Sequence, residues 1–289
     1  MSATFDDILR RADRQNRKRV VISGENDPAA LSALGKARDR GWVETVACGQ
    51  SFAHGAPGTE VRFSSHPLEE ARLDAMAMVR AGDAELLVDT GPVDPSFFST
   101  INDKRVGIRE GKVLSYINIF TAPKNGRLTM LTDTLINPEP DLKEKIGIVE
   151  NIIRLARALG IERPKIAALA PLELVNLALQ STLDAAILSK MAERGQLGGA
   201  IIEGPLGMDN AESASAAIHK GISSPVPGGT DVYLFPDLES ANLTAQFLAW
   251  VGQCQLCGIL GGATVPIVIC SPLEPPESWL LNLALGMLY

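Results

Sequence analysis

Short apolar runs rich in β-branched residues alternate along this chain with amphipathic helical patterns, and this alternation limits the possible folds more than any other feature. The runs at 165–170, 198–204 and 231–237 lack a polar face, which is typical of strands buried on both sides in a parallel sheet. Parallel neighbours require crossover connections, usually helices. The sequence therefore predicts an α/β protein with mostly parallel sheets.

Turn residues place the expected elements along the chain. Thr90-Gly91-Pro92 ends one apolar run, and Lys124-Asn125-Gly126 lies between two others, which is typical of a hairpin. The longest helical pattern follows the turn at 137–141 and ends at Gly160. Strands are predicted at 19–24, 44–49, 84–89, 113–120, 127–133, 165–170, 198–204, 231–237, 257–262 and 266–271, and helices at 28–40, 66–81, 141–159, 182–194, 210–220, 239–252 and 277–288.

Composition and charge exclude several classes of protein. The net charge of −7 argues against nucleic acid and acidic membranes as partners. No apolar run approaches the ~20 residues of a membrane span, and the first residues lack the apolar segment of a signal peptide. The loop after 84–89 has neither a dinucleotide fingerprint nor a Walker lysine, which disfavours a nucleotide-dependent enzyme. The cysteines lack the spacing of a disulfide framework, so we expect a cytoplasmic protein.

Cys254 and Cys257 have the spacing of a redox motif, but a second interpretation is stronger. A redox site needs an exposed first cysteine at a helix start, whereas this pair is predicted to lie where a helix meets a buried strand. A metal site is unsupported without a second cysteine pair, and we expect both residues in the core. His54, His66 and His219 are not spaced for metal ligation, which predicts surface or capping positions for them.

Polar residues follow the predicted strand at 198–204, where functional groups of α/β folds gather. Asp209 and Asn210 stand at the start of the next helix, and they suit either helix capping or contact with a ligand. The later loop from Lys220 through Ser223 and Ser224 offers a cation, two hydroxyls and a backbone bent by Gly and Pro. It can present N–H groups to an anion, or it can be an ordinary helix end with the lysine near the negative end of the dipole.

Three motifs in the segment 203–242 carry a family resemblance. They are GPLGMDNA, HKGISSPVPG and FPDLESAN, and further stretches such as VGIREGKVLSYINIF and LTDTLINPEPDLKEKIG extend the similarity over nearly the whole chain. In this order and spacing they resemble the phosphate acetyl/butyryl transferases, in the butyryl-type form. The resemblance implies the two-domain fold of the isocitrate and isopropylmalate dehydrogenases, with the active site in the interdomain cleft.

The resemblance also implies an activity and an assembly. Members of the family convert acyl-CoA and inorganic phosphate into acyl phosphate and free coenzyme A, usually as homodimers. We therefore expect acyl-CoA and phosphate as substrates, with no bound cofactor and no metal. A first α/β domain is expected at residues 1–118 and 260–289, and a second, dimerising α/β domain at residues 119–259.

Site residues follow from the same resemblance, position by position. The central serine of the family corresponds to Ser271, and its downstream carboxylate to Glu277, with Glu274 as the second candidate. Phosphate and oxyanion need cations or N–H donors, the thiol needs a base, and glycines let the backbone approach coenzyme A. The expected substrate-binding residues are Arg109, Asp209, Asn210, Lys220, Ser223, Ser224, Asp237, Asn242, Gly258 and Gly262.

The chain departs from the family pattern at positions where the family has cations. The arginine after the serine is Pro272, and the Met-Lys-Gly turn of the family reads Val88-Asp89-Thr90-Gly91, which either replaces its lysine or inserts a residue beside it. Two further lysines read Ala178 and Gln246, and the segment around Thr100 has no arginine. Because a charge-assisted hydrogen bond contributes about 1.5–3 kcal/mol, these losses bear directly on the binding of polyanionic substrates.

Two hypotheses follow from matches and departures together. The first is a phosphate acyltransferase in which Lys104, Arg109, Lys112 and Lys220 compensate for the missing cations. The second is a paralogue of the same fold that lacks the activity and acts as a binding or partner protein. A decarboxylating dehydrogenase of this fold is disfavoured, since its arginine cluster and metal-binding aspartates are missing.

Overall fold

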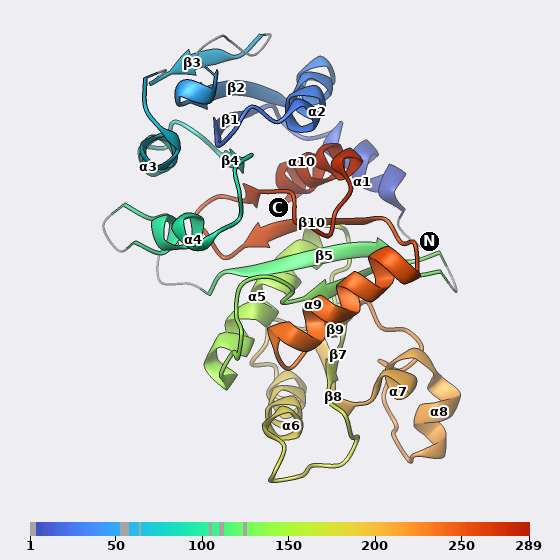
Figure 1. Ribbon diagram of the computed structural model, residues 1–289. Coiled ribbons are helices and arrows are strands. Elements are labelled where there is room, and N and C mark those ends of the chain that lie inside the picture. Colours follow the sequence, from blue (N-terminus) through green and yellow to red (C-terminus); the bar gives the residue numbers. More distant parts are fainter. Residues whose placement is uncertain (1–3, 53–57, 64, 104–105, 110–112, 124–125) are drawn as a thin grey trace. The chain divides into compact units, whose positions relative to one another are not determined.

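The computed structural model describes residues 4–52, 58–63, 65–103, 106–109, 113–123 and 126–289 (Figure 1). The chain divides into two compact units. We call residues 4–114 with 255–289 the terminal unit, and residues 115–254 the central unit. Each unit has its own strands and helices, and the predicted α/β class with mostly parallel strands is confirmed.

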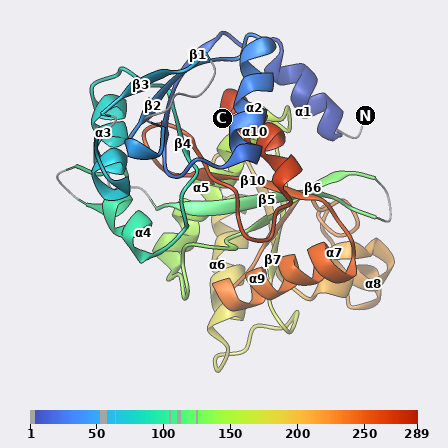
Figure 2. The same ribbon diagram turned by 45° about the horizontal axis from the view of Figure 1, so that its top comes forward.

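The terminal unit contributes the strand order β3-β2-β1-β4-β11-β10. All neighbours in this row are parallel except β10 and β11, which pair antiparallel. Helices α1 and α2 both contact α10, and α3 contacts α4 (Figure 2). The elements are α1 (Phe5–Ala12), β1 (Lys18–Ser23), α2 (Pro28–Asp39), β2 (Val43–Cys48), β3 (Glu60–Arg62), α3 (Leu68–Arg80), β4 (Leu86–Asp89), α4 (Pro95–Asn102), β10 (Leu256–Gly261), β11 (Ile267–Val268) and α10 (Trp279–Leu288).

The parallel register of this unit gathers several loops at one edge of the sheet. Ser23 pairs with Asp89, so β1 and β4 end side by side. Val268 pairs with Val88, so the turn that follows β11 begins at the same edge. The carboxyl edge of the terminal unit therefore carries the loops after β1, β4 and β11, which is where α/β proteins place their ligands.

The central unit contributes the order β5-β6-β9-β7-β8. β5 and β6 are antiparallel, and the other neighbours are parallel. The loops after β6, β7, β8 and β9 therefore start from one edge of this sheet. The elements are β5 (Ser115–Thr121), β6 (Leu128–Thr132), α5 (Leu142–Ala158), β7 (Lys165–Leu169), α6 (Gln180–Glu193), β8 (Ile201–Leu206), α7 (Met208–Glu212), α8 (Ala214–His219), β9 (Val232–Leu234) and α9 (Leu238–Gln246), which continues as a π-helical turn (Phe247–Val251).

Several predicted elements need correction. The helix predicted at 210–220 is broken into α7 and α8 at Ser213, because the Ser213 side chain caps α8 by accepting the N–H of Ala216. Helices α1 and α4 and the short strand β3 were not predicted. The hairpin residues Lys124 and Asn125 lie outside the described residues.

The prediction for the cysteine pair is half right. Cys257 lies buried in β10, and burial raises the pKa of its thiol well above the usual value. Cys254 is only half-buried, because the chain leaves the π-helical turn through Gly252 and Gln253 before β10 begins. All four cysteines are free thiols.

The described residues contain neither a membrane-spanning helix nor a cluster of metal ligands. None of their helices combines the length and the apolar character that a membrane crossing requires. Within the same ranges, no three His, Cys, Asp or Glu side chains are grouped so that they could hold a metal ion.

Candidate active site

Ser271 sits in a tight turn directly after β11, at the carboxyl edge of the terminal unit. It is 3% exposed. Its carbonyl accepts the N–H of Glu274 at 2.9 Å, and its hydroxyl accepts the N–H of Leu273 at 3.3 Å. The turn thus holds the backbone of Ser271 through its carbonyl, and its hydroxyl through one longer hydrogen bond.

The structure separates the two carboxylates that were considered for this turn. Glu274 is buried, and its Oε2 accepts a hydrogen bond from Asn282 Nδ2 at 2.7 Å. Glu277 lies in the short 3₁₀ helix at Pro276–Ser278 and is exposed. Glu274, the second choice of the sequence analysis, is therefore the carboxylate that shares the turn with Ser271.

The predicted glycines of the coenzyme A channel lie on and after β10. The N–H of Gly258 donates to Asn282 Oδ1 at 2.9 Å, so this donor already has a partner. Gly262 follows the strand with a φ of +94°, in the region that favours glycine. Asn282 was missed by the sequence analysis. A polar residue in the apolar run WLLNLALGML was the signal that could have found it.

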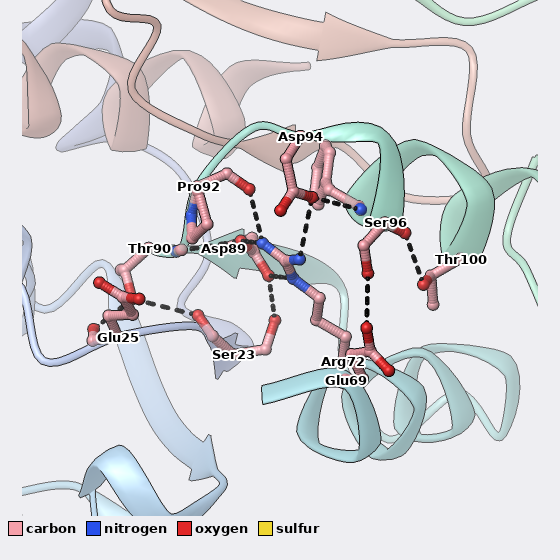
Figure 3. A network of polar contacts seen from close by, with 12 residues as sticks. Ser23, Glu25, Glu69, Arg72, Asp89, Thr90, Pro92, Asp94, Ser96 and Thr100 are labelled. Carbon is pink, nitrogen blue, oxygen red and sulfur yellow. Dashed lines mark hydrogen bonds and ion pairs between the residues drawn. The ribbon is translucent and has the colours of Figure 1, made fainter. Parts of the chain in front are cut away.

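Asp89 is the centre of a buried polar network (Figure 3). Arg72 Nε and Nη2 donate to its two carboxylate oxygens at 3.0 and 2.9 Å, and both side chains are 1% exposed. The hydroxyl of Ser23 donates to Asp89 Oδ2 at 2.7 Å, and the N–H of Gly91 donates to Oδ1 at 3.0 Å. The carboxylate is thereby surrounded by donors on both oxygens.

The same arginine holds the loop between β4 and α4. Arg72 Nη2 donates to the carbonyl of Pro92 at 2.8 Å, and Nη1 lies 3.6 Å from Asp94, the residue that caps α4 (Figure 3). The guanidinium also lies over the ring of Phe97 at 5.1 Å. The buried Arg72–Asp89 ion pair therefore also shapes the loop between β4 and α4.

Close packing between the loops after β1 and β4 explains why residue 24 is a glycine. Gly24 has a φ of +115°, and a Cβ there would lie 2.3 Å from the backbone N of Gly91. Only glycine fits this approach, so the loops after β1 and β4 are packed backbone to backbone.

Of the cations predicted to compensate, Arg109 and Lys220 lie among the described residues. Arg109 is half-buried, and its Nη1 donates to Asn102 at the end of α4 at 2.9 Å. Lys104 and Lys112 lie outside the described residues, as does His54.

Lys220, the remaining predicted cation, is held between two acids of the central unit. Its Nζ lies 3.2 Å from Glu173 Oε2 and 3.2 Å from Asp209 Oδ2. The hydrogen bonds to Asp209 and Glu173 raise the pKa of Lys220, and its hydrogen bond to Asp209 lowers the pKa of that carboxyl. The predicted ligand residues Lys220 and Asp209 are thus brought together, but as a cluster that carries one more acid than base.

Asn210 is the predicted residue with the strongest local signal for a ligand. Its side chain is 0% exposed, and neither its oxygen nor its nitrogen has a hydrogen-bond partner among the described residues. Leaving a buried donor or acceptor unpaired costs about 1–3 kcal/mol. The amide is therefore costly to the folded protein unless something outside the chain pairs with it.

Ser223 and Ser224 line a hollow beside α8. Its volume is about 430 Å³, and Ser224 Oγ accepts the N–H of Val226 at 3.3 Å within the loop. The hollow is formed by Ala214, Ala217, Ile218, Gly221, Ile222, Ser223, Ser224 and Pro227.

A larger cavity opens at the carboxyl edge of the central unit, among the loops after β6, β7 and β9. Its volume is about 670 Å³. Inside it, Lys145 Nζ pairs with Asp184 Oδ2 at 2.6 Å, and both side chains are buried. Ala178 lines this cavity. Among its described lining residues there are five acids and one lysine, Lys145; the acids are Glu139, Asp141, Asp184, Asp237 and Glu239.

Asp237 and Asn242, the last predicted binding residues, already have structural partners. Asp237 caps α9 by accepting the N–H of Ser240 at 2.8 Å. Asn242 donates to the carbonyl of Thr134 at 2.9 Å and accepts from Gln246 at 2.7 Å. Only Asp237 of the two lines the cavity, and its acidic wall is a poor match for a phosphate group.

Comparison with known proteins places this chain among relatives of similar length. The model of the phosphate acetyl/butaryl transferase family matches residues 53–275. The phosphate butyryltransferase of Clostridium acetobutylicum is 33% identical over 296 aligned residues, which cover 100% of this chain and 98% of that protein. The phosphate acetyltransferase of Thermotoga maritima is 33% identical, with 96% of each chain covered.

Solved structures agree with this placement. A branched-chain phosphotransacylase from Enterococcus faecalis V583 superposes with a TM-score of 0.79 at 25% identity, covering 93% of this chain and 98% of that one. A phosphotransacetylase from Streptococcus pyogenes has a TM-score of 0.80 at 17% identity, covering 98% and 97%. The second likeness shows the shared fold.

Proposed function

We propose, from the premise that this chain belongs to the phosphate acetyl/butyryl transferase family, that it transfers a short acyl group between coenzyme A and inorganic phosphate. Butyryl is favoured as the acyl group, because phosphate butyryltransferases from two Clostridium species align over 100% of the chain, against 96% for the Thermotoga maritima phosphate acetyltransferase at the same 33% identity. The observation that carries the proposal is the buried turn in which Ser271 and Glu274 lie together at the carboxyl end of β11.

The proposed reaction needs little from the protein beyond positioning and charge. A phosphate oxygen attacks the acyl carbon, the C–O bond forms, and the C–S bond breaks through a tetrahedral oxyanion. In this proposal the hydroxyl of Ser271 donates a hydrogen bond to that oxyanion. The proton that the attacking hydrogen phosphate loses passes to the departing sulfur, and in the reverse direction the thiol of coenzyme A gives its proton to the leaving phosphate.

The test of this activity uses the unmodified protein. We expect purified protein to release thiol from butyryl-CoA, and more slowly from acetyl-CoA, only when phosphate is present. A chromogenic thiol reagent follows the release, and hydroxylamine traps the acyl phosphate. Thiol release that is independent of phosphate would indicate a hydrolase, and the absence of release with either acyl-CoA would favour a paralogue without activity.

The proposal extends to a homodimer formed by the central unit. Leu243, Phe247, Trp250 and Val251 recur at helical spacing along α9 and its π-helical turn, and they are between 62% and 77% exposed. Contiguous apolar surface of this kind marks interaction sites on soluble proteins. A second copy of the chain, presenting the same stripe across a two-fold axis, is the simplest partner.

Changing Trp250→Glu is expected to convert this dimer into a monomer, because the substitution places a charge in the middle of an apolar contact. Light scattering after size exclusion measures the mass, which is expected to be twice 30.8 kDa for the natural chain and 30.8 kDa for the variant. Gln196→Glu, an exposed change outside the stripe, serves as the control and is expected to remain a dimer. A dimer that persists in Trp250→Glu would remove α9 from the interface.

The proposed compartment is the cytoplasm. Free thiols at all four cysteine positions suit a reducing environment, and the proposed substrates are metabolites of the cytoplasm.

A further inference from the structure

Helix α10 contains a single amide among apolar neighbours. Asn282 is 0% exposed, and the helix around it reads WLLNLALGML. Burying a polar side chain costs free energy unless its groups are hydrogen-bonded. The presence of asparagine at position 282 is therefore explained by its hydrogen-bond partners and not by apolar packing.

Three hydrogen bonds of Asn282 join separate parts of the candidate active site. Its Oδ1 accepts the N–H of Gly258 on β10 at 2.9 Å. Its Nδ2 donates to the carbonyl of Ile269, just after β11, at 3.0 Å and to Glu274 Oε2 at 2.7 Å. One side chain thus ties together β10, the end of β11 and the turn that holds Ser271.

The bond to Glu274 is the one that matters for chemistry. Glu274 is a buried carboxylate on a side chain with several rotatable bonds, and a hydrogen bond to Oε2 restricts where its charge can lie. The thiols of Cys257 and Cys270 lie close enough to feel its charge. Burial is the main cause that raises the pKa of each thiol, and the charge of Glu274 raises it further. The backbone of Glu274 is fixed at the same time by Ser271.

We propose that Asn282 is a positioning residue, which holds Glu274 so that its carboxylate accepts the proton of the coenzyme A thiol during acyl transfer. In the direction of acyl-CoA formation, the S–H bond breaks and its proton passes to Glu274. The sulfur forms a C–S bond to the acyl carbon, and the C–O bond to phosphate breaks. The proton then passes from Glu274 to the leaving phosphate, so the residue ends as it began. This inference rests on the proposed function.

A double-mutant cycle tests whether Asn282 acts through Glu274. Glu274→Gln is expected to lower kcat for acyl-CoA formation by about 10²-fold, since general acid–base catalysis contributes about 10²–10⁴-fold. Asn282→Ser is expected to lower kcat by about 10-fold, with an unchanged KM for coenzyme A, because it loosens the base without removing it. In the Glu274→Gln background, Asn282→Ser is expected to have no further effect on kcat.

The pH profile supplies a readout that a purely structural role does not move. Asn282→Asp places a second carboxylate against Glu274, and like charges so close raise the pKa of the pair. The limb of kcat that rises with pH is therefore expected to move to higher pH in this variant and to disappear in Glu274→Gln. Asn151→Asp, which buries a carboxylate in α5 of the central unit, is the matched control and is expected to keep the natural profile.

The outcomes separate this inference from the activity itself. An inactive natural protein overturns the proposed function and this inference with it. An active natural protein whose rising limb persists in Glu274→Gln, or whose Asn282→Ser effect adds fully to that of Glu274→Gln, overturns the inference alone. The Asn282→Ser and Glu274→Gln arms decide the question even where Asn282→Asp does not fold.

Discussion

Ser271→Ala is expected to lower the rate of phosphate-dependent thiol release by about 10²–10³-fold, the usual cost of removing one donor to a tetrahedral oxyanion. Among the described residues, the hydroxyl has one long hydrogen bond to hold it in the turn, which it accepts from the N–H of Leu273 at 3.3 Å. Its removal therefore perturbs the turn little, and the KM for acyl-CoA is expected to stay within about twofold. Steady-state kinetics with butyryl-CoA and phosphate give both constants.

A nearby serine provides the matched control for this substitution. Ser278 is 0% exposed, and its hydroxyl donates to the carbonyl of Leu256 at 2.5 Å. Ser278→Ala is expected to reduce stability by about 1 kcal/mol, as loss of an ordinary hydrogen bond does, and to leave most of the activity. If Ser271→Ala keeps more than a tenth of the natural kcat, the hydroxyl does not serve the transition state.

Arg72→Met is expected to be the most destabilising single change at the carboxyl edge of the terminal unit. Removing one partner of a buried ion pair costs about 3–5 kcal/mol, because the remaining charge stays buried without its counterion. Asp89 would keep only the hydroxyl of Ser23 and the N–H of Gly91 as donors. Urea denaturation followed by circular dichroism measures the loss of unfolding free energy.

A second substitution shows whether charge is the cause of that loss. Asp89→Asn in the Arg72→Met background removes the stranded charge but keeps an oxygen that can accept from Gly91. The double variant is therefore expected to recover more than half of the lost stability. A double variant as unstable as Arg72→Met would mean that the loop contacts of the arginine, to Pro92 and Asp94, carry the effect instead.

The strands other than β3 could be predicted from the sequence because they lie in continuous apolar runs between turn residues, whereas β3 (Glu60–Arg62) is short and polar. The run 165–170, for example, is found as β7 at Lys165–Leu169. Helix α4 (Pro95–Asn102) escaped prediction although Asp94 caps it and Pro95 opens it, because its Pro/Gly-rich approach reads as a loop. The break at Ser213 was missed for a related reason. The period of the apolar residues does not show that a serine within a helical pattern caps a new helix, as Ser213 does for α8.

Ser271 could be proposed from the sequence because its position matched a motif, whereas contacts that cross between elements could not be foreseen. Arg72 lies on a helix expected to be amphipathic, and nothing local shows that its guanidinium is turned inward to Asp89, 17 residues away in the sequence. From spacing alone we predicted Glu277 as the carboxylate, with Glu274 second, and both stay predictions. Glu274 is buried through its contact with α10 and Glu277 is exposed, a difference that spacing does not show.

The division of the terminal unit between both parts of the chain has a consequence for synthesis on the ribosome. Strand β4 pairs with β11, but the entire central unit lies between them in the sequence. The central unit is continuous and can fold as soon as residues 115–254 have left the exit tunnel, whereas β4, paired with β1 on one side, must wait for its second neighbour until 255–289 are made. The nascent chain thus carries an open strand edge at β4, and the terminal unit, begun first, is the last to be completed.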